Sequence, residues 1–226
     1  AASYLGDLVD GVISISEAKD YADIVHQTFL RRELVRISDN VIHDAQNPDI
    51  EIPAQTQIEA AEQHLFDFLN EQKIPYQRMD HDPVYTVEES KKLNLGLEGG
   101  ATKNLFLRDK KGKRHFLFCV EQSKQVDLKK VPALVESSNL SFASPERLMK
   151  HLGILPGSVS LLALINDSDG QVEVLIDQDL WEEENILCHP LVNTSTLSLK
   201  REDLEHYINK TGHEFQLVQV PCQLPN

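Results

Sequence analysis

Beyond residue 71 the chain alternates between short apolar runs and amphipathic segments, with turn signals between them. Apolar runs predict strands at 116–120, 159–165, 172–176 and 215–220. Helical patterns predict short helices at 86–93, 128–136, 145–152 and 201–209. The turn at 109–113 predicts a hairpin between 105–107 and 115–120. This order indicates an α/β fold, an α+β mixed sheet with surrounding helices.

The first 66 residues follow a different pattern. No Gly or Pro interrupts the chain from Ser16 to Gln46, and apolar residues there recur at spacings of three and four. A second helix is expected to begin near Ala54, after Pro53. Two such helices cannot close a core alone, so we expect a helical segment at 1–66 and a separate domain at 67–226.

The net charge of the chain is −14, which disfavours non-specific binding to nucleic acid. RNA binding would therefore need a local basic patch, and one cluster falls within a dozen residues. The same cluster can also be read as a solvated hairpin loop. Its members are Lys103, Arg108, Lys110, Lys111, Lys113 and Arg114.

Several functional classes find no support in the sequence. No apolar run reaches the roughly 18–20 residues that cross a bilayer, so no membrane partner is expected. Three scattered cysteines fit a reducing cytoplasm. No metal-ligand spacing and no phosphate-binding loop is present. Cys188 and His189 are adjacent, but neighbours along a strand face opposite ways, which disfavours a thiol-protease pair.

Three segments carry candidate chemistry. Residues 99–107 place Lys103 and Asn104 at the mouth of a strand after two glycines. Residues 155–160 form a turn that leads into an expected buried strand, and backbone N–H groups at such a turn can hold an oxyanion. Residues 189–194 begin with His189 and Pro190. Each segment also has an ordinary reading: a surface lysine, a tight turn and a structural histidine beside an edge-strand proline.

Taken together, these segments resemble the prolyl-tRNA editing family, which comprises the insertion domain of bacterial prolyl-tRNA synthetases and its stand-alone relatives. The resemblance runs from about residue 68 to 220 and is greatest to the stand-alone branch that acts on Ala-tRNA(Pro). It rests on the order and spacing of Ile74-Pro75-Tyr76, His81-Asp82-Pro83-Val84-Tyr85-Thr86-Val87-Glu88-Glu89, Thr102-Lys103-Asn104-Leu105-Phe106-Leu107, Leu140-Ser141-Phe142-Ala143-Ser144 and His189-Pro190-Leu191-Val192-Asn193.

The resemblance implies a metal-free, cofactor-free hydrolase in which Lys103 is essential. It implies that Asn104 and His189 line the same pocket and that Gly157 belongs to a Gly-x-x-x-Pro loop. Leu161 stands where that loop has proline. The further substrate-binding residues that we expect are Thr102, Ser158, Ser160, Val84, Val87, Leu95 and Asn193, and the expected tRNA-binding residues are Arg108, Lys110, Lys111, Lys113 and Arg114.

The sequence thus predicts a cytoplasmic trans-editing deacylase that serves translation fidelity, with the acceptor end of mischarged tRNA as its partner. Lys103 and turn N–H groups would stabilise negative charge on the ester oxygen while a water attacks. The removed amino acid stays open, since related domains remove alanine, cysteine or other small residues. A non-catalytic module that binds tRNA or protein is the alternative.

Residues 1–66 resemble the later part of the N-terminal domain of bacterial replicative DNA helicases, on Tyr21-Ala22-Asp23-Ile24-Val25 and Leu30-Arg31-Arg32-Glu33-Leu34 among other runs. In that family the region consists of helices and mediates self-association, so these residues are a possible dimerisation arm. No ATP-binding loop follows, so we expect neither helicase activity nor a DNA partner. A weaker reading is a helicase-associated interaction factor.

Overall fold

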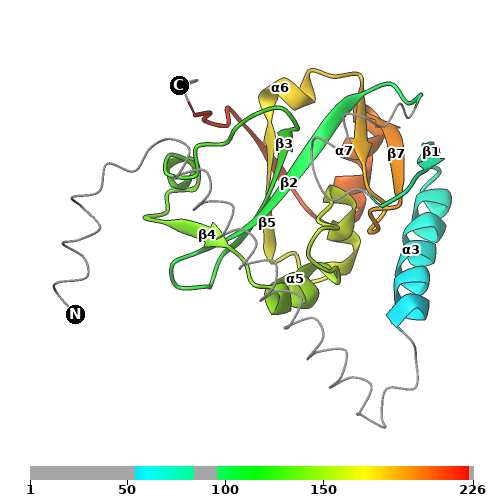
Figure 1. Ribbon diagram of the computed structural model, residues 1–226, viewed down its shortest axis with the longest axis horizontal. Helices are drawn as coiled ribbons and strands as arrows, with labels where there is room; N and C mark the ends of the chain where they lie inside the picture. The colour runs from blue at the N-terminus through cyan, green and yellow to red at the C-terminus, as the bar shows by residue number, and fades with distance from the viewer. Residues whose placement is uncertain (1–53, 84–95, 224–226) are drawn as a thin grey trace, which may run out of the picture. The chain divides into compact units, whose positions relative to one another are not determined.

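The computed structural model describes residues 54–83 and 96–223. The chain divides into two units, 1–53 and 54–226, and the second contains all the described residues. Figure 1 shows its helices and strands. In chain order they are α3 (Ala54–Glu71), β1 (Gln77–Asp80), β2 (Gly100–Asp109), β3 (His115–Glu121), η1 (Val131–Val135), β4 (Leu140–Phe142), α5 (Pro145–Leu152), η2 (Leu161–Asn166), β5 (Val172–Asp177), α6 (Gln178–Trp181), β6 (Asn185–Cys188), β7 (Ser195–Lys200), α7 (Arg201–Lys210) and β8 (Phe215–Val218).

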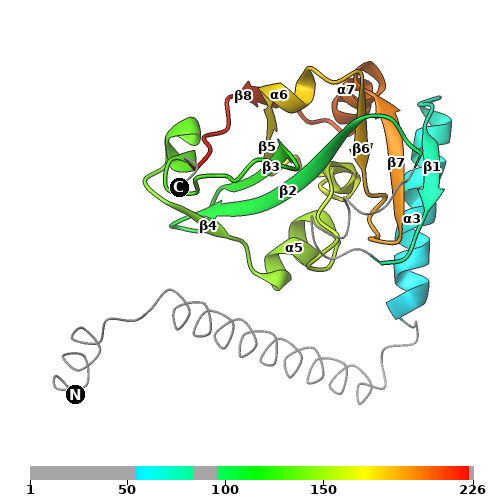
Figure 2. The same cartoon turned by 45° about the horizontal axis from the view of Figure 1, so that its top comes forward.

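The described strands form one mixed sheet in the order β1-β7-β6-β2-β3-β5-β8, with β4 paired to β2. The long strand β2 crosses the unit in Figures 1 and 2 and belongs to both halves of the sheet. One edge of β2 pairs antiparallel with β3 from Thr102 to Arg108. The opposite edge pairs in parallel with β6 at Gly100 and Ala101, and antiparallel with β4 from Leu107 to Asp109.

The two faces of the sheet carry different cores. Helices α3, α5, α6 and α7, together with η2, cover one face, and their apolar residues form the larger cluster with Phe106, Leu117 and Cys119. The 3-10 helix η1 and the chain around Val220 cover part of the other face, over Leu107, Phe116, Phe118 and Val120. Because side chains alternate along a strand, these clusters show which face each residue of β2 occupies.

Most of the predicted elements are confirmed. The hairpin of β2 and β3, the helix at 145–152, the helix beginning at Ala54 and the strand at β5 all lie where the sequence placed them. The helix expected at 128–136 is a shorter 3-10 turn, and β1, β4, β6, β7 and α6 were not predicted. The helices expected within 1–53 and at 86–93 lie outside the described residues.

The strand predicted at 159–165 is wrong, because residues 161–166 form the 3-10 helix η2. Ser160 caps this helix by accepting a hydrogen bond from Leu162 N–H at 3.2 Å. The Tyr207 hydroxyl donates to the Leu162 carbonyl and fixes the turn from the side of α7. A short apolar run that is buried all round carries no periodicity that separates strand from helix.

The expected boundary between residues 66 and 67 falls within α3. Leu65, Phe66 and Leu69 of this helix are buried in the larger core cluster. Their burial is what joins residues 54–71 to the second unit.

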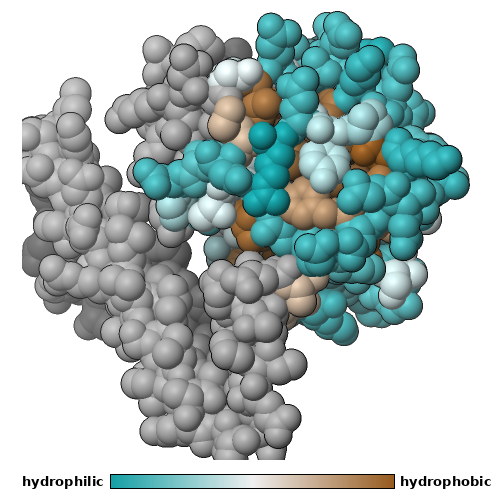
Figure 3. Space-filling model, turned by 90° about the vertical axis from the view of Figure 1, so that its right-hand side faces the viewer, coloured by the Kyte–Doolittle hydropathy of each residue, from teal (hydrophilic) through white to brown (hydrophobic). Residues whose placement is uncertain are grey.

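The face drawn in Figure 3 is mainly polar. Figure 3 shows the side of the unit seen from the right of Figure 1, where hydrophilic residues surround smaller hydrophobic areas. Among the described residues, no helix is both long and apolar enough to span a membrane.

A buried polar cluster joins the β2–β3 hairpin to α5. The His115 and His151 rings lie 4.0 Å apart, and Arg147 donates from Nη1 to His115 Nε2 at 2.8 Å and to the Gly112 carbonyl at 3.0 Å. His115 is 4% exposed. Burial, followed by the charges of His151 and Arg147, lowers the pKa of His115 to about 4. The folded protein therefore holds His115 neutral with Nε2 as a hydrogen-bond acceptor.

We predict that stability falls between pH 6.5 and 4 because the unfolded chain binds a proton there that folded His115 does not. At about 1.36 kcal/mol per pKa unit, the loss attributable to His115 is about 3 kcal/mol at the acid end. Urea unfolding of the wild type and of His115→Gln at several pH values measures it. The glutamine oxygen can still accept from Arg147, so a slope equal to that of the wild type contradicts the prediction.

Candidate functional site

The edge of β2 that faces β6 and β4 opens between these two strands. β6 ends at Cys188, beside the start of β2, and β4 ends at Phe142, opposite Leu107. In the described part of the chain, no strand pairs with residues 102–106 along this edge. The carboxyl ends of both neighbouring strands point into the opening, and such ends are where ligands bind in many open sheets.

Lys103 and Asn104 lie at this opening and leave β2 on opposite faces. Lys103 pairs with Val120, which belongs to the smaller core cluster, whereas Asn104 pairs with Cys119, which belongs to the larger one. Because the two side chains lie on opposite faces of the sheet, they cannot enter the same pocket directly, contrary to the expectation. A substrate would have to reach Asn104 around the open edge.

The side chain of Asn104 is incompletely satisfied. Its Nδ2 donates to the Thr102 hydroxyl at 3.5 Å, while its Oδ1 is buried without a partner among the described residues. Thr102 in turn donates from Oγ1 to the Leu187 carbonyl at 2.8 Å and ties β2 to the end of β6. A buried carbonyl oxygen without a donor is costly and is available to a ligand N–H or a water.

His189 follows β6 directly and sits between two anchors. Its carbonyl accepts from the Ser160 hydroxyl at 2.5 Å, and its ring Nδ1 lies 3.1 Å from the Ser195 carbonyl. Because a carbonyl only accepts, Nδ1 carries the proton and Nε2 carries the lone pair of the neutral ring. Burial lowers the pKa of His189, although the Ser195 hydrogen bond opposes this.

The register places His189 on the same face of the sheet as Lys103. Ala101 pairs with Leu187 in parallel, so continuing by two residues brings Lys103 level with His189. His81 joins them from the end of β1, with its ring centroid 6.4 Å from that of His189. Thr196 holds the His81 ring through a 2.9 Å contact between Oγ1 and Nε2.

His81 was not among the predicted site residues. The signal that could have found it was present, since His81 opens the His-Asp-Pro run that carries the family resemblance. No pattern in the sequence shows that residue 81 lies close to residue 189 in space. The antiparallel pairing of β1 with β7 makes that connection, and the His81 N–H donates to the Thr194 carbonyl at 2.8 Å.

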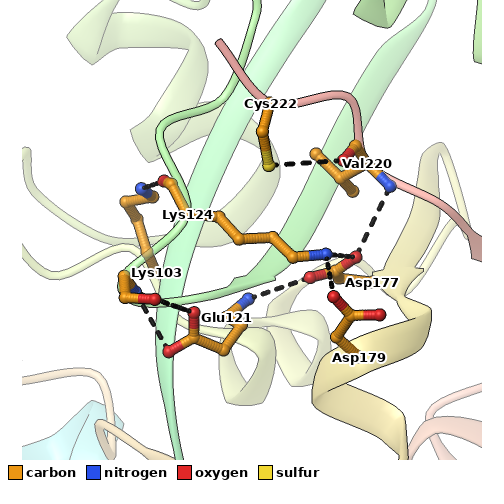
Figure 4. Close-up of polar contacts among 8 residues, drawn as sticks. Lys103, Glu121, Lys124, Asp177, Asp179, Val220 and Cys222 are labelled. Carbon is orange, nitrogen blue, oxygen red and sulfur yellow. Dashed lines mark hydrogen bonds and ion pairs between the residues drawn. The ribbon is translucent and has the colours of Figure 1, made fainter. Parts of the chain in front are cut away.

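The ammonium of Lys103 is directed along its own face toward the turn after β3. Its Nζ donates to the carbonyl of Lys124, a contact drawn in Figure 4. The side chain of Lys124 then reaches the buried carboxylate of Asp177 at 2.7 Å. Lys103 is therefore partly buried and held in place.

The loop from 189 to 194 is strained as well as anchored. Leu191 has a φ of 67°, which is unfavourable for a leucine, and its side chain is buried in the larger core. Such strain costs on the order of 1–3 kcal/mol and persists only where surrounding packing holds it. Asn193 lies in the same loop and is half-buried.

The turn at 155–158 has the geometry that its glycine requires. Ser158 N–H donates to the Leu155 carbonyl at 3.2 Å, and Gly157 has a φ of 95° at the third position, as in a type II turn. Leu161, which replaces the expected proline, is the first residue of η2. Proline is favoured at the first position of a helix, and leucine at residue 161 also allows η2 to begin there.

Ser160, expected to bind substrate, is fully buried, and its hydroxyl is already bonded to His189 and Leu162. Its contribution is therefore to position His189.

The basic hairpin lies at the far end of β2 from Lys103. Arg108 is five residues along the strand, which is roughly 17 Å at the usual rise. Lys110, Lys111 and Lys113 at its tip are exposed. Arg114 is engaged differently, because it forms two hydrogen bonds to Glu173 at 2.6 and 2.7 Å. The structure therefore does not bring the hairpin and Lys103 together.

A hollow of about 310 Å³ lies near β6 and β7, and neither Lys103 nor His189 lines it. Ser198 lines it, and the Ser198 hydroxyl donates to the Glu98 carbonyl at 2.9 Å. Val84, Val87 and Leu95, the expected pocket wall, lie outside the described residues. Within the described chain, no cluster of three or more His, Cys, Asp or Glu side chains is arranged to hold a metal ion.

Cys188 does not form a catalytic pair with His189. Burial raises the pKa of its thiol to about 12, and the histidine is bonded to Ser195. A thiol protonated at neutral pH is a poor nucleophile.

Comparison with known proteins identifies the family. Residues 81–207 match the model of the aminoacyl-tRNA editing domain. The chain belongs to this family. It is 38% identical to the Prolyl-tRNA editing protein ProX of Acetoanaerobium sticklandii over 160 residues, which are 71% of this chain and 98% of that protein. The crystal structure of a candidate trans-editing enzyme for prolyl tRNA synthetase shares the fold, with a TM-score of 0.55, 19% identity, and coverage of 71% of this chain and 98% of that one.

A second, shorter similarity concerns helicases. The chain is 36% identical to the Replicative DNA helicase DnaB of Rickettsia felis over 70 residues, which are 31% of this chain and only 14% of that protein. The predicted self-association through residues 1–66 falls mostly outside the described residues and stays a prediction.

We predict that His189 in this editing domain titrates below pH 6.5, the value of an unburied histidine, because burial disfavours its charged form. NMR of ring-labelled histidine should also show the proton on Nδ1 at neutral pH. The His189→Gln variant assigns the resonance. A midpoint at or above 6.5, or a proton on Nε2, would show that the ring is not held as described.

Proposed function

We propose that this chain is a stand-alone deacylase that removes alanine from mischarged tRNA(Pro). Membership in the aminoacyl-tRNA editing family and the similarity to ProX support the reaction class. The observation that carries the proposal is that strand register puts Lys103 and His189 on one face beside the opening in the sheet, with the His81 ring 6.4 Å from the His189 ring.

The reaction is hydrolysis of the ester between the amino acid and the terminal adenosine. Water adds to the ester carbonyl carbon, and the bond to the ribose oxygen then breaks. The proton lost by the water ends on the ribose oxygen, so the products are free amino acid and tRNA. Aminoacyl esters are activated, so positioning and charge stabilisation supply most of the rate. The ammonium of Lys103 stabilises the negative oxygen as it develops.

His189 assists as a neutral imidazole. Its Nδ1 is committed to Ser195, so Nε2 accepts a proton or a hydrogen bond from water or from the neighbouring ribose hydroxyl. The buried Oδ1 of Asn104 is suited to the α-ammonium of the amino acid, provided that the substrate enters by the open edge. Thr102 and Ser160 hold the backbone of this arrangement, and Gly157, Ser158 and Asn193 lie in the loops that flank it.

Selectivity follows from size. A small aliphatic pocket admits alanine and excludes proline by steric clash, whereas rejecting a substrate that lacks one methylene yields only about 1–3 kcal/mol. We assign the wall to Val84, Val87 and Leu95. The acceptor end of tRNA is the partner, and the cytoplasm, where charged tRNA is used, is the proposed location.

We predict that Lys103→Ala lowers deacylation of Ala-tRNA(Pro) by at least about 100-fold, because one donor to a developing oxyanion contributes that much. Release of labelled alanine measures the rate. Lys210→Ala, an exposed lysine at the end of α7, is the matched control and should keep the wild-type rate.

A panel of Ala-tRNA(Pro), Ser-tRNA and Cys-tRNA tests the substrate. A wild-type chain that binds these tRNAs but releases no amino acid would instead be the non-catalytic module. An active Lys103→Ala variant would remove Lys103 from the reaction.

We predict that Lys110→Ala/Lys111→Ala weakens tRNA binding and makes it less sensitive to salt. Each lost phosphate contact should reduce the slope of log Kd against log salt concentration by roughly 0.7–0.9. The turnover at saturating tRNA should not change, because the hairpin is remote from Lys103. Fluorescence anisotropy with labelled tRNA gives Kd, and Arg114 is left intact because it pairs with Glu173. An unchanged slope would place the acceptor stem elsewhere.

A further inference from the structure

The turn that holds Lys103 is itself fixed by a buried charge network. After β3 the chain turns through residues 121–124, with Lys124 N–H donating to the Glu121 carbonyl at 3.2 Å. The Glu121 carboxylate accepts from the Ser123 N–H at 3.0 Å. The carbonyl of Lys124 then accepts from Lys103 Nζ, as Figure 4 shows. A well-defined turn therefore presents the acceptor to the lysine.

The side chain of Lys124 points the other way, across the sheet. Its Nζ lies 2.7 Å from Asp177 and 2.8 Å from Asp179, and the side chain is 13% exposed. Asp177 is fully buried, and Asp179 is largely exposed. Only one of the two carboxylates therefore depends on Lys124 for shielding from an apolar interior.

The Asp177 side chain binds the end of β3, the turn after it and the chain at Val220. Its carboxylate accepts from the backbone N–H groups of Glu121 and Val220, each at 3.4 Å, in addition to Lys124. It occupies the N-cap position of α6 but makes no side-chain cap bond to that helix. The carboxylate is thus turned toward the end of β3.

Asp177 and Lys103 also share a face and a row of the sheet. Lys103 pairs with Val120, and extending the β3–β5 register by one residue places Asp177 on the other side of Val120. Two strand spacings separate the backbones of Lys103 and Asp177, about 10 Å. A lysine side chain spans much of that distance, so an unneutralised Asp177 would compete for the Lys103 ammonium.

We propose that Lys124 is the positioning residue of this site. By pairing with Asp177 and Asp179, it fixes the turn whose carbonyl holds Lys103, and it keeps the Lys103 ammonium from turning to Asp177. The inference rests on the proposed role of Lys103 in deacylation. It assigns to Lys124 no contact with the substrate.

Three variants test this role. Lys124→Met keeps the length of the side chain and removes the charge. Lys124→Arg restores a cation that can bridge both carboxylates. Lys124→Met/Asp177→Asn removes the charge and its competitor together. Lys130→Ala is the matched control, because Lys130 lies in the following turn, is 62% exposed and pairs with Asp127, three residues before it, at 3.3 Å.

Lys124→Met should lower kcat for Ala-tRNA(Pro) by about 10- to 100-fold, as expected for a misplaced catalytic group, with KM changed less than twofold. Lys124→Arg should recover most of that loss, and the double variant should recover the part that comes from competition by Asp177. Lys130→Ala should match the wild type. Circular dichroism and melting curves for every variant confirm that rates are compared among folded proteins.

Two results overturn the proposal: a kcat for Lys124→Met within about twofold of the wild type, or a loss that neither Lys124→Arg nor the double variant recovers, which indicates general damage. The wild type and Lys103→Ala are measured first. If the wild type is inactive or Lys103→Ala is fully active, the proposed function fails instead, and the two failures are thereby distinguished.

Discussion

The arrangement of this molecule depends on one strand that changes partners. β2 pairs with β6 for two residues and, after a gap, with β4, while β3 runs along its other edge. The gap leaves part of β2 without a neighbouring strand in the described chain, and Lys103 lies in it. A lysine on a continuous sheet would be covered by its neighbours or would point into solvent. Here it lies at an opening toward which the ends of two strands converge.

The two lysines of the site have different partners: Lys124 pairs with a carboxylate, and Lys103 binds a backbone carbonyl. Lys124 neutralises buried Asp177, and the Glu121 carboxylate braces the turn at 121–124 that presents the Lys124 carbonyl to Lys103. Histidines supply the other polar groups, and burial lowers the pKa of His189, which favours its neutral form. A site of this kind can stabilise a developing negative charge with one cation and accept a proton with an uncharged base. It can do so in a protein whose net charge is −14, because the cations act locally.

The fold was largely accessible from the pattern of residues. The hairpin of β2 and β3 follows from its turn, and α5 follows from Ser144 and Pro145. The strand prediction at 159–165 failed because Leu-Leu-Ala-Leu-Ile is almost entirely buried, and such a run fits either a strand or a tight helix. The strands β1, β6 and β7 are short, and pairing rather than composition makes them strands. The sequence singles out Lys103, His189 and Gly157, and His81 lies in a run that carries the resemblance, but no sequence pattern marks Lys124 or Asp177.

What the sequence by itself determined is the chemistry available: a lysine at the mouth of a strand, a histidine before proline, a glycine in a turn and a core large enough to hold them. Local residue types and short spacings carry that information. Only the tertiary structure decided that Asn104 leaves β2 on the face opposite Lys103, that Ser160 is used to hold His189, and that Lys124 stands between Lys103 and Asp177. These relations depend on strand register between distant segments, and a shift of one residue would move each side chain to the other face.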